Sequence, residues 1–357
     1  MAVVHHSALG RPERPTVSVC IANYNGEELL ADCIGSVLEQ LGIAQGSVEI
    51  IVHDDASTDD SVAWLRRHHP HVELLASEEN VGFCVSNNRM VAHARGEFVL
   101  LLNNDAALFP DALASLLAAA REHSAPSILT LPQYDWETGA LVDRGCLLDI
   151  FYNPVPNLDG RRREVAYAIG ACLWIPRTLW HALGGFPEWM ESIGEDVYLC
   201  CGARLGGVRV LALTDSGFRH RLGASFGGAR VSGNRGLNTT IRRRRLSERN
   251  KTFALIVFTP AAAVWVLLAI HVVLLLMEGL LVALWRLNPR IFVDIYGNVP
   301  LAVMRSWRTL RAERRRAQVS RTARLREYYA SFSMLPRKIS LLARFGIPHI
   351  EKRKGAA

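Results

Sequence analysis

The sequence has no pair of cysteines at the spacing of a metal-binding or redox motif. Its seven cysteines are scattered along the chain, two of them adjacent at Cys200 and Cys201, and no CxxC occurs among them. An odd number of scattered cysteines predicts neither a disulfide framework nor a zinc site. We therefore expect buried thiols in a reducing compartment.

Two further absences narrow the class of protein. No GxGxxG follows the first predicted strand, which weighs against a dinucleotide-dependent oxidoreductase. Residues 1–15 form a polar N-terminal extension without the apolar core of a signal peptide, so we expect the first domain to stay in the cytosol. What is present is a chain of 357 residues, half of them hydrophobic, long enough for one large domain plus an appendage.

Acidic residues are scarce near the C-terminus. From Arg286 to Ala357 the sequence has 17 Lys and Arg against 4 Asp and Glu, a net charge of +13, whereas the whole chain carries +7. The preceding 285 residues are therefore net acidic, at −6. A basic tail of this kind attracts either nucleic acid or an anionic membrane.

Short apolar runs alternate with helical patterns in the first third of the chain. Amphipathic helices are predicted at 27–41, 59–68 and 84–94. The strands around them are predicted at 16–22, 48–53, 72–76 and 98–102. This alternation predicts right-handed βαβ units, a parallel sheet and an α/β fold.

Polar side chains follow each of these four strands. They are Asn23 and Asn25, then Asp54 and Asp55, then Asn80, then Asn103, Asn104 and Asp105. Asn and Asp are common turn residues, so any one cluster alone would fit a turn. Because ligands sit beyond the carboxyl ends of strands in open α/β sheets, four clusters together favour a binding site. A carboxylate such as Asp105 can hold a hard divalent cation that also grips a phosphate.

Later residues add a second group of candidates. A strand is predicted at 168–175, where Gly170 and Ala171 permit close approach of a ligand to the backbone. Glu195 and Asp196 follow a loop and begin the next helix, where acids favour the positive end of the helix dipole. A carboxylate placed in a site can equally act as a general base.

Six sequence blocks occur in a fixed order: VSVCIANYNG, EIIVHDDASTDDS, ENVGFCVSNN, GEFVLLLNNDA, AIGACLWIPR and GEDVYLC. In this order they resemble glycosyltransferase family 2, and within it the bacterial rhamnosyltransferase-like branch. The resemblance covers about residues 16 to 230. It implies an inverting, nucleotide-sugar-dependent enzyme whose Rossmann-like GT-A catalytic domain occupies residues 16–235.

The resemblance also assigns roles to residues. Asp54 matches the aspartate that accepts a hydrogen bond from the imide N–H of uracil or thymine. This is chemically sound because an ionised carboxylate is only a hydrogen-bond acceptor and the imide N–H is a donor. The full set expected to bind the nucleotide sugar is Ala22, Asn23, Tyr24, Asn25, Asp54, Asp55, Asn80, Gly82, Phe83, Asn87, Asn103, Asn104, Gly170 and Ala171.

The remaining roles are those of the metal ligands and of the general base. Asp105 takes the place of the last aspartate of the metal-binding DxD motif and, with His220, would hold Mn²⁺ or Mg²⁺. Asn103 stands where the stricter motif has Asp, so only Asp105 supplies charge. Asp196 is the expected general base of an in-line transfer, with Glu195 as the alternative base or as a residue that orients Asp196. Arg219, Arg221 and the glycine-rich segment 223–228 are expected to close over the diphosphate as a lid.

The C-terminal part contains one long apolar segment. Residues 253–285 are hydrophobic, follow a basic linker at 236–252 and precede a basic amphipathic tail at 286–357. About 20 apolar residues suffice to cross a bilayer, although a buried soluble helix is the alternative. Basic clusters on both sides favour a re-entrant hairpin or an in-plane helix, broken near 271–279, over a single crossing. Because the tail adjoins this segment, its expected partner is anionic membrane lipid and not nucleic acid.

These observations predict an inverting glycosyltransferase on the cytoplasmic face of a bacterial inner membrane. It would move a sugar, with rhamnose as the first expectation, from a dTDP- or UDP-linked donor to a polyprenyl-linked or cell-surface polysaccharide acceptor. Two alternatives stay open. One is a processive polysaccharide synthase subunit, and the other is a non-catalytic membrane scaffold with a nucleotide-sugar-binding fold.

Overall fold

The computed structural model describes residues 3–122, 125–221, 230–231, 237–260, 263–345 and 349–351. The chain divides into two compact units. Unit 1 takes Met1–Cys146, Pro156–Ala203 and Val208–Arg221, and unit 2 takes Leu147–Val155, Arg204–Gly207 and Leu222–Ala357. The predicted catalytic residues all lie in unit 1.

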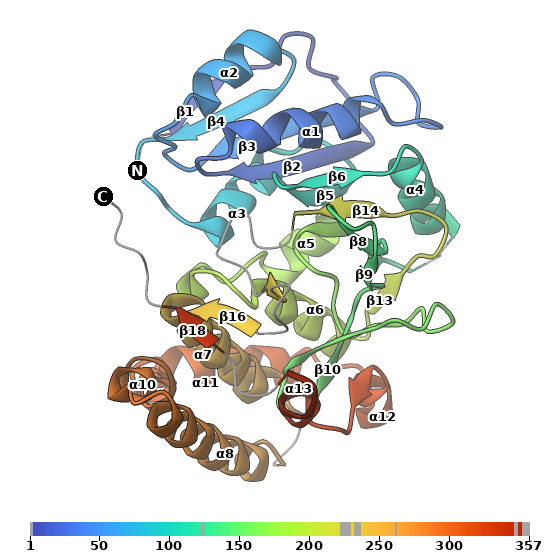
Figure 1. The fold of residues 1–357 in the computed structure, drawn as a ribbon. Coiled ribbons are helices and arrows are strands. Elements are labelled where there is room, and N and C mark those ends of the chain that lie inside the picture. Colours follow the sequence, from blue (N-terminus) through green and yellow to red (C-terminus); the bar gives the residue numbers. More distant parts are fainter. Residues whose placement is uncertain are drawn as a thin grey trace. The chain divides into compact units, whose positions relative to one another are not determined.

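Unit 1 is built on an eight-stranded sheet, with the order β1-β4-β3-β2-β5-β12-β7-β13 (Figure 1). The four strands at its centre are parallel, and β12 runs antiparallel to both of its neighbours. The strands are β1 Val3–His6, β4 Glu73–Ser77, β3 Val48–Asp54, β2 Val17–Asn23, β5 Phe98–Asn103, β12 Cys172–Pro176, β7 Ser127–Thr130 and β13 Arg209–Ala212. The predicted α/β fold with its parallel sheet is confirmed.

The order of the parallel strands reverses at β2. Strand β2 pairs with β3 on one side and with β5 on the other, so successive crossovers go in opposite directions from this point. A crevice forms beyond the carboxyl ends of the strands at such a switch point. Asn23 ends β2 and Asn103 ends β5, and each strand is almost wholly buried.

Helices cover the sheet and bury its apolar residues. They are α1 Glu27–Leu38, α2 Ser61–His68, α3 Phe83–His93, α4 Ala112–Glu122, α5 Arg177–Leu183, the 3₁₀ turn η1 Glu188–Met190, and α6 Glu195–Leu205. Alternate residues Val17, Val19 and Ile21 of β2 share one core with Leu30 of α1 and Leu113 of α4. Each of the first three helices begins within two residues of its predicted start.

A second, four-stranded sheet completes unit 1. Its order is β6-β14-β8-β9, with β6 Ala106–Leu108, β14 Phe218–His220, β8 Gln133–Asp135 and β9 Leu141–Asp143. Strand β6 begins directly after Asp105, and its Ala106 pairs with His220 of β14. This antiparallel register brings two residues more than a hundred positions apart to the same edge.

The strand predicted at 168–175 is shorter than expected. Strand β12 begins only at Cys172, and Gly170 and Ala171 form a turn before it. The apolar pattern did not reveal this boundary because the turn residues are buried too: Ala168 and Ala171 are 0% and 2% exposed.

The N-terminal residues are not an extension separate from the domain. Val3–His6 forms β1, which pairs antiparallel with β4 at the edge of the main sheet. Five residues after this strand, Arg11 donates hydrogen bonds from Nε to Glu49 Oε2 and from Nη1 to Glu73 Oε1, both at 2.7 Å. The two glutamates are buried on neighbouring strands, so a single guanidinium satisfies both carboxylates and holds the N-terminal residues in place.

Unit 2 is mainly helical. Its helices are α7 Ile241–Phe258, α8 Ala263–Trp285, α9 Pro289–Ile291, the π-helix η2 Phe292–Tyr296, α10 Asn298–Arg305, α11 Trp307–Val319, α12 Leu325–Tyr329 and α13 Arg337–Phe345. Two small sheets accompany them: β11 Pro154–Pro156, β10 Cys146–Asp149 and β17 Phe332–Ser333 in one, and β15 Arg230–Val231, β16 Leu237–Thr240 and β18 His349–Glu351 in the other.

The predicted linker and hydrophobic segment are divided differently in the structure. Residues 241–252, expected in a basic linker, are the first two thirds of α7, whose N-terminus is capped by Thr240 Oγ1 accepting from Arg243 N at 3.2 Å. The apolar run breaks at the end of α7 and not near 271–279, which lies inside α8. The polar residues there are tolerated because His271 Nε2 lies 2.8 Å from Thr252 Oγ1 and Glu278 accepts from Arg244 at 2.7 Å.

The hydrogen bonds and cationic groups around Glu73 predict how the stability of the fold depends on pH. Burial alone raises the pKa of Glu73, but hydrogen bonds from Ala8 N, His93 and His5 and the charge of Arg11 outweigh it and lower the pKa to about 2. The ionised form therefore stabilises the fold above the ordinary pKa of glutamate, and this contribution is lost as the pH falls through 2. We expect Glu73→Gln to lower the free energy of unfolding by about 3 kcal/mol at pH 6.

Urea unfolding of unit 1, followed by fluorescence at several pH values, measures this difference. The gap between wild type and Glu73→Gln should shrink steadily below about pH 4. Glu79→Gln, an exposed glutamate just beyond the end of β4, is the matched control and should change stability by less than about 0.5 kcal/mol. A gap that stays constant from pH 6 to pH 2 would contradict the proposed contribution of the ionised carboxylate.

Candidate active site

A chain of hydrogen bonds joins the carboxyl ends of β5, β2 and β3. Asn104 Nδ2 donates to Asn23 Oδ1 at 2.8 Å, and Asn23 Nδ2 donates to Asp54 Oδ2 at 2.9 Å. All three side chains are at most 5% exposed. The chain requires Gly26, because a Cβ at that position would lie 2.2 Å from Asn104 Nδ2.

Asp54 is held rigidly by its own turn. Ser57 donates to it twice, from N to Oδ1 at 2.9 Å and from Oγ to Oδ2 at 2.7 Å. With the bond from Asn23, three of the roughly four acceptor positions of the carboxylate are used, which leaves one for a ligand. Ser57 Oγ also accepts from Asn25 N at 2.9 Å, and Asn25 has a positive φ of 48°. Two turns are thus fixed around one carboxylate.

Asp55 organises the third strand end. Its Oδ1 accepts from Val81 N at 2.6 Å and its Oδ2 accepts from Gly82 N at 2.9 Å. Burial raises the pKa of Asp55 above its ordinary value, and these two bonds oppose the rise. Asn80 Nδ2 donates to the carbonyl oxygen of Asp55 at 3.2 Å. Asp55 and Asn80 therefore shape the loop that leads into α3.

Asp105 and His220 form a buried pair. His220 Nε2 lies 3.0 Å from Asp105 Oδ1, and the two residues are 7% and 2% exposed. His220 Nδ1 is buried and has no hydrogen-bond partner among the residues that the structure describes. A carboxylate oxygen next to an imidazole nitrogen is a donor set that a divalent transition-metal ion accepts. The two residues predicted as metal ligands therefore fit that role.

A cation lies next to this pair. Arg221 follows His220 and donates its backbone N–H to the carbonyl oxygen of Asp105 at 2.9 Å. Its guanidinium stacks over the Trp136 ring, 3.8 Å from the centroid, and is paired with Asp32. The segment 223–228, predicted as a lid, lies outside the described residues.

Asp196 is tied to the turn before β12. Its Oδ2 accepts from Gly170 N at 3.2 Å, and its Oδ1 accepts from Val197 N at 2.7 Å. Ala171, next to Gly170, accepts a bond at 3.2 Å from the backbone N–H of Asn103 at the end of β5. Asp196 is therefore linked by backbone contacts to the same edge that carries Asp105.

The two acids at the start of α6 differ in exposure. Glu195 is only 7% exposed, whereas Asp196 is partly exposed. The loop before them is strained, with positive φ at the non-glycine residues Glu191 (66°) and Ile193 (69°). Strain of this kind persists where the surrounding structure over-determines it, often at functional sites. The accessible carboxylate is Asp196.

Aromatic and small residues lie beside this carboxylate. The Phe83 ring stacks on Phe186 at 6.0 Å, and a Cβ on Gly170 would meet the Phe83 ring at 3.7 Å. Asn88 bonds both backbone groups of Phe186, which fixes the loop before η1 to α3. Asn87, predicted to contact the donor, instead donates to the carbonyl oxygen of Phe83 in its own helix at 2.8 Å.

The other predicted donor-binding residues lie at the same edge. Tyr24 is 52% exposed at the end of β2, and Ala22 pairs with Asn103 across β2 and β5. Asn103 is partly exposed, and no described residue bonds its side-chain amide. The structure therefore brings every predicted donor-binding residue except the inward-turned Asn87 to the carboxyl edge.

Some residues at this edge were not found from the sequence. Gly26 and Trp136 act through Asn104 and Arg221, which are distant in the chain, and Ser57 bonds both the nearby Asp54 and the distant Asn25. Asp143 of β9 is a fourth: burial raises its pKa to about 6, although the N–H of Gly145 and the charge of His220 lower it. The burial of Asp143 and its proximity to His220 come from tertiary contacts, so the sequence offered no signal for it.

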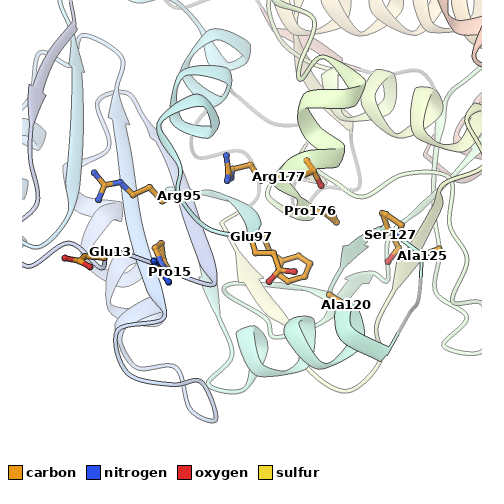
Figure 2. A pocket seen from close by; sticks show the side chains of 13 residues that line it. Glu13, Pro15, Arg95, Glu97, Ala120, Ala125, Ser127, Pro176 and Arg177 are labelled. Carbon is orange, nitrogen blue, oxygen red and sulfur yellow. The ribbon is translucent and has the colours of Figure 1, made fainter.

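A separate cavity of about 600 Å³ lies at the opposite edge of the sheet (Figure 2). Among the residues that line it are Pro15, Phe98 and Ser127, at or just before the amino ends of β2, β5 and β7. Arg95, Glu97 and Arg177 also border it. Because it adjoins the amino ends of these strands, it is not part of the candidate active site.

Comparison with known proteins matches the first half of the chain. The family model "Glycosyl transferase family 2" matches residues 18–179. Chondroitin synthase from Escherichia coli is 33% identical over 190 residues, which are 52% of this chain and 26% of that protein. The putative teichuronic acid biosynthesis glycosyltransferase TuaG from Bacillus subtilis is 31% identical over 114 residues, 31% of this chain and 44% of TuaG. The chain thus spans less than half the length of these relatives.

Solved structures share the fold at low sequence identity. The mannosyltransferase PcManGT from Pyrobaculum calidifontis, in complex with GDP-Man and Mn²⁺, has a TM-score of 0.51 at 20% identity, covering 87% of this chain and 88% of its own. TarS 1-349 from S. aureus, in complex with UDP, has a TM-score of 0.50 at 17% identity, covering 85% of this chain and 92% of its own.

The strand order, the polar carboxyl edge and these matches agree. The expected fold is confirmed as an α/β domain of the GT-A fold, and residues 18–179 match the model of glycosyl transferase family 2.

Proposed function

We propose that this chain is an inverting glycosyltransferase of family 2 that moves a sugar from a nucleotide diphosphate to a saccharide or lipid-linked acceptor. The observation that supports this most is the continuity of the carboxyl edge. Hydrogen bonds run from Asp54 through Asn23 to Asn104, and backbone contacts link the neighbouring Asn103 to Asp196. Along this edge, the hydrogen-bond acceptor for a nucleobase comes first, the metal-binding pair next, and the carboxylate for proton transfer last.

The donor's base and diphosphate would occupy different parts of this edge. The open acceptor position of Asp54 suits the imide N–H of uracil or thymine, with the exposed Tyr24 ring beside it. The diphosphate would lie near Asp105 and His220, with Arg221 as an additional cation. The donor is therefore proposed to be dTDP- or UDP-linked, and rhamnose remains the first expectation for the sugar.

Asp196 is the proposed general base. It would accept the proton of the acceptor hydroxyl while the hydroxyl oxygen bonds to the anomeric carbon from the side opposite the diphosphate. The bond between the anomeric carbon and the diphosphate oxygen breaks, and the nucleoside diphosphate leaves with the electron pair. Gly170 N would hold Asp196 Oδ2 in place during this step, since the two atoms are 3.2 Å apart.

Asp105 and His220 are the proposed ligands of a divalent cation. When bound, the cation neutralises the charge that develops on the leaving diphosphate. Because the set includes an imidazole nitrogen, Mn²⁺ fits it better than Mg²⁺, which prefers oxygen ligands throughout. The mannosyltransferase that shares the fold was solved with Mn²⁺.

The acceptor and the location follow from unit 2 and from the relatives. Among the described residues one helix, α8, is long and apolar enough to cross a membrane, which by itself is weak evidence. TuaG is named for teichuronic acid biosynthesis and ExoO of Rhizobium meliloti for succinoglycan biosynthesis. We propose a polyprenyl-linked or cell-surface polysaccharide acceptor, with the enzyme on anionic lipids at the cytoplasmic face of the bacterial inner membrane.

Two alternative functions have less support. A processive synthase that exports its polymer needs several membrane spans, and the described residues contain one candidate helix. A non-catalytic scaffold would not need an accessible acid beside the donor site, yet Asp196 is partly exposed.

Nucleotide binding tests the metal site. Calorimetry of dTDP and UDP with detergent-purified full chain should give at least tenfold tighter binding with Mn²⁺ than without, about 1.4 kcal/mol. Asp105→Ala should lose this gain because half of the ligand pair is removed. The control Asp60→Ala, an exposed acid before α2, should keep it. Absence of binding for both nucleotides under every metal condition would favour the scaffold.

Turnover tests the base. With membrane extract as acceptor and candidate nucleotide sugars as donors, Asp196→Asn should lower nucleoside diphosphate release by about 10²- to 10⁴-fold, because the proton acceptor is lost. Nucleotide affinity in the calorimetric assay should stay within about threefold. Glu195→Gln is the matched variant. If it alone abolished release, the buried Glu195 would be the base and the assignment to Asp196 would be wrong.

A further inference from the structure

Helix α8 turns an apolar face outward from unit 2. Val266, Val273, Leu281 and Leu284 are between 57% and 65% exposed, and Trp285 is 70% exposed. These positions fall on one side of the helix at 100° per residue. A surface helix of a soluble protein normally places polar residues on that side, so this face requires an apolar environment.

The opposite face of α8 is packed within unit 2 along its whole length. Val264, Leu275 and Val282 are at most 5% exposed, and the helix contacts α7, α9 and η2. Gly279 lies against Tyr296 so closely that a Cβ would be 2.5 Å from the Tyr296 ring. The buried side of α8 is therefore packed against α7, α9 and η2.

Charged groups lie on this packed side. Glu278 of α8 accepts from Arg244 at 2.7 Å and is paired with Lys338, and the same two cations pair with the buried Glu248 of α7. Helix α8 is about 34 Å long, enough to cross a bilayer if upright. An upright helix would carry these paired charges into hydrocarbon, at a cost of several kcal/mol. An orientation parallel to the membrane keeps them on the protein side.

A small cavity lies near the start of α8. It has a volume of about 270 Å³ and is lined by Ile256, Trp265, Trp307, Arg311, Arg314, Arg315 and Gln318. The two tryptophan rings are 5.9 Å apart. Arg314 is occupied, since its Nη1 donates to the carbonyl oxygens of Ile256 and Thr259 at 2.7 Å each. Arg311 and Arg315 make no ion pair or side-chain hydrogen bond with any residue that the structure describes.

These residues combine two properties of membrane interfaces. Tryptophan is enriched at the level of the lipid headgroups, where one edge of the ring is apolar and the other polar. A guanidinium presents paired donors that match two phosphate oxygens. Arg311 and Arg315 are one helical turn apart on α11, so both can reach one anion in the cavity.

We propose that the outward face of α8 lies flat in a membrane surface and that the cavity binds the phosphate of an anionic phospholipid headgroup. We call this combination the docking face; it comprises the exposed apolar residues of α8 with Trp265, Trp307, Arg311 and Arg315. The partner is a lipid bilayer because Arg311 and Arg315, which pair with no residue that the structure describes, lie beside the apolar face, and because the tail from residue 286 carries a net charge of +13. The inference rests on the membrane association included in the proposed function.

Vesicle flotation of the full chain tests the phosphate site. The double variant Arg311→Gln and Arg315→Gln should bind phosphatidylglycerol vesicles about 25-fold more weakly, at about 5-fold per arginine. The matched control, Arg316→Gln with Arg321→Gln, removes two exposed cations outside the cavity and should lose less than about 5-fold. Equal losses in the two pairs would overturn the site. So would complete competition by millimolar glycerol phosphate, which would point to a free phosphate ligand.

The depth of labels along α8 tests its orientation. Val266→Cys, Val273→Cys and Leu284→Cys would each carry an environment-sensitive fluorophore, and lipids quenched at known depths would report its position. All seven native cysteines are buried and free, so the label should react with the introduced residue. We expect the three labels at similar shallow depth, about 5–10 Å below the headgroups. A middle label much deeper than both ends would indicate a crossing helix and overturn the proposal.

Two other results would also count against it. If the labels stayed unquenched by lipid while the protein formed a concentration-dependent dimer, the face would pack against a second copy of the chain. Nucleotide binding in detergent separates this inference from the proposed function. The Arg311 and Arg315 variant should retain Mn²⁺-dependent nucleotide binding. A wild-type protein that bound nucleotide but did not float with vesicles would reject only the docking face, whereas absence of nucleotide binding in the wild type would reject the transferase.

Discussion

The side-chain amide of Asn23 holds the candidate site together. It accepts from Asn104 and donates to Asp54, so one side chain at the end of β2 fixes the ends of both neighbouring strands. All three groups are buried, and a buried polar group that loses its partner costs about 1–3 kcal/mol. The geometry of the edge is therefore set by the fold before any ligand binds. Such preorganisation lets donors and acceptors act without rearranging during a reaction.

Buried charges follow the same rule elsewhere in the molecule. In unit 1, Arg11 satisfies Glu49 and Glu73 on adjacent strands. In unit 2, Arg244, Lys251 and Lys338 surround Glu248, and the pKa of Glu248 is well below its ordinary value because these cations outweigh the effect of burial. Breaking one partner of such a group is costly because the other is left charged and unpaired. The N-terminal strand and the helices of unit 2 are thus tied to their units by charge as well as by apolar packing.

Much of the fold could be predicted because its signals are local. The fully apolar run of β5 and the alternation of strands with helices depend only on neighbouring residues, and the predicted elements appear within a few positions. Errors occurred where a segment is held by distant partners. Residues 3–6 form a strand because β4 offers a free edge, and α8 continues through His271 and Glu278 because α7 and α13 supply their partners. Hydropathy along the sequence contains no information about those contacts.

For the site, the sequence alone determined which residues follow the strands. Asn23, Asp54, Asn104 and Asp105 each end an apolar run, and the carboxyl ends of parallel strands must meet at one edge. Only the tertiary structure decided how these groups are bonded. The pairing of Asp105 with His220 depends on the register of β6 and β14, which lie more than a hundred residues apart. The tertiary structure also directs the Asn87 side chain back onto its own helix and leaves Asp196 more accessible than Glu195. Exposure depends on which elements cover a side chain and not on its neighbours in the chain.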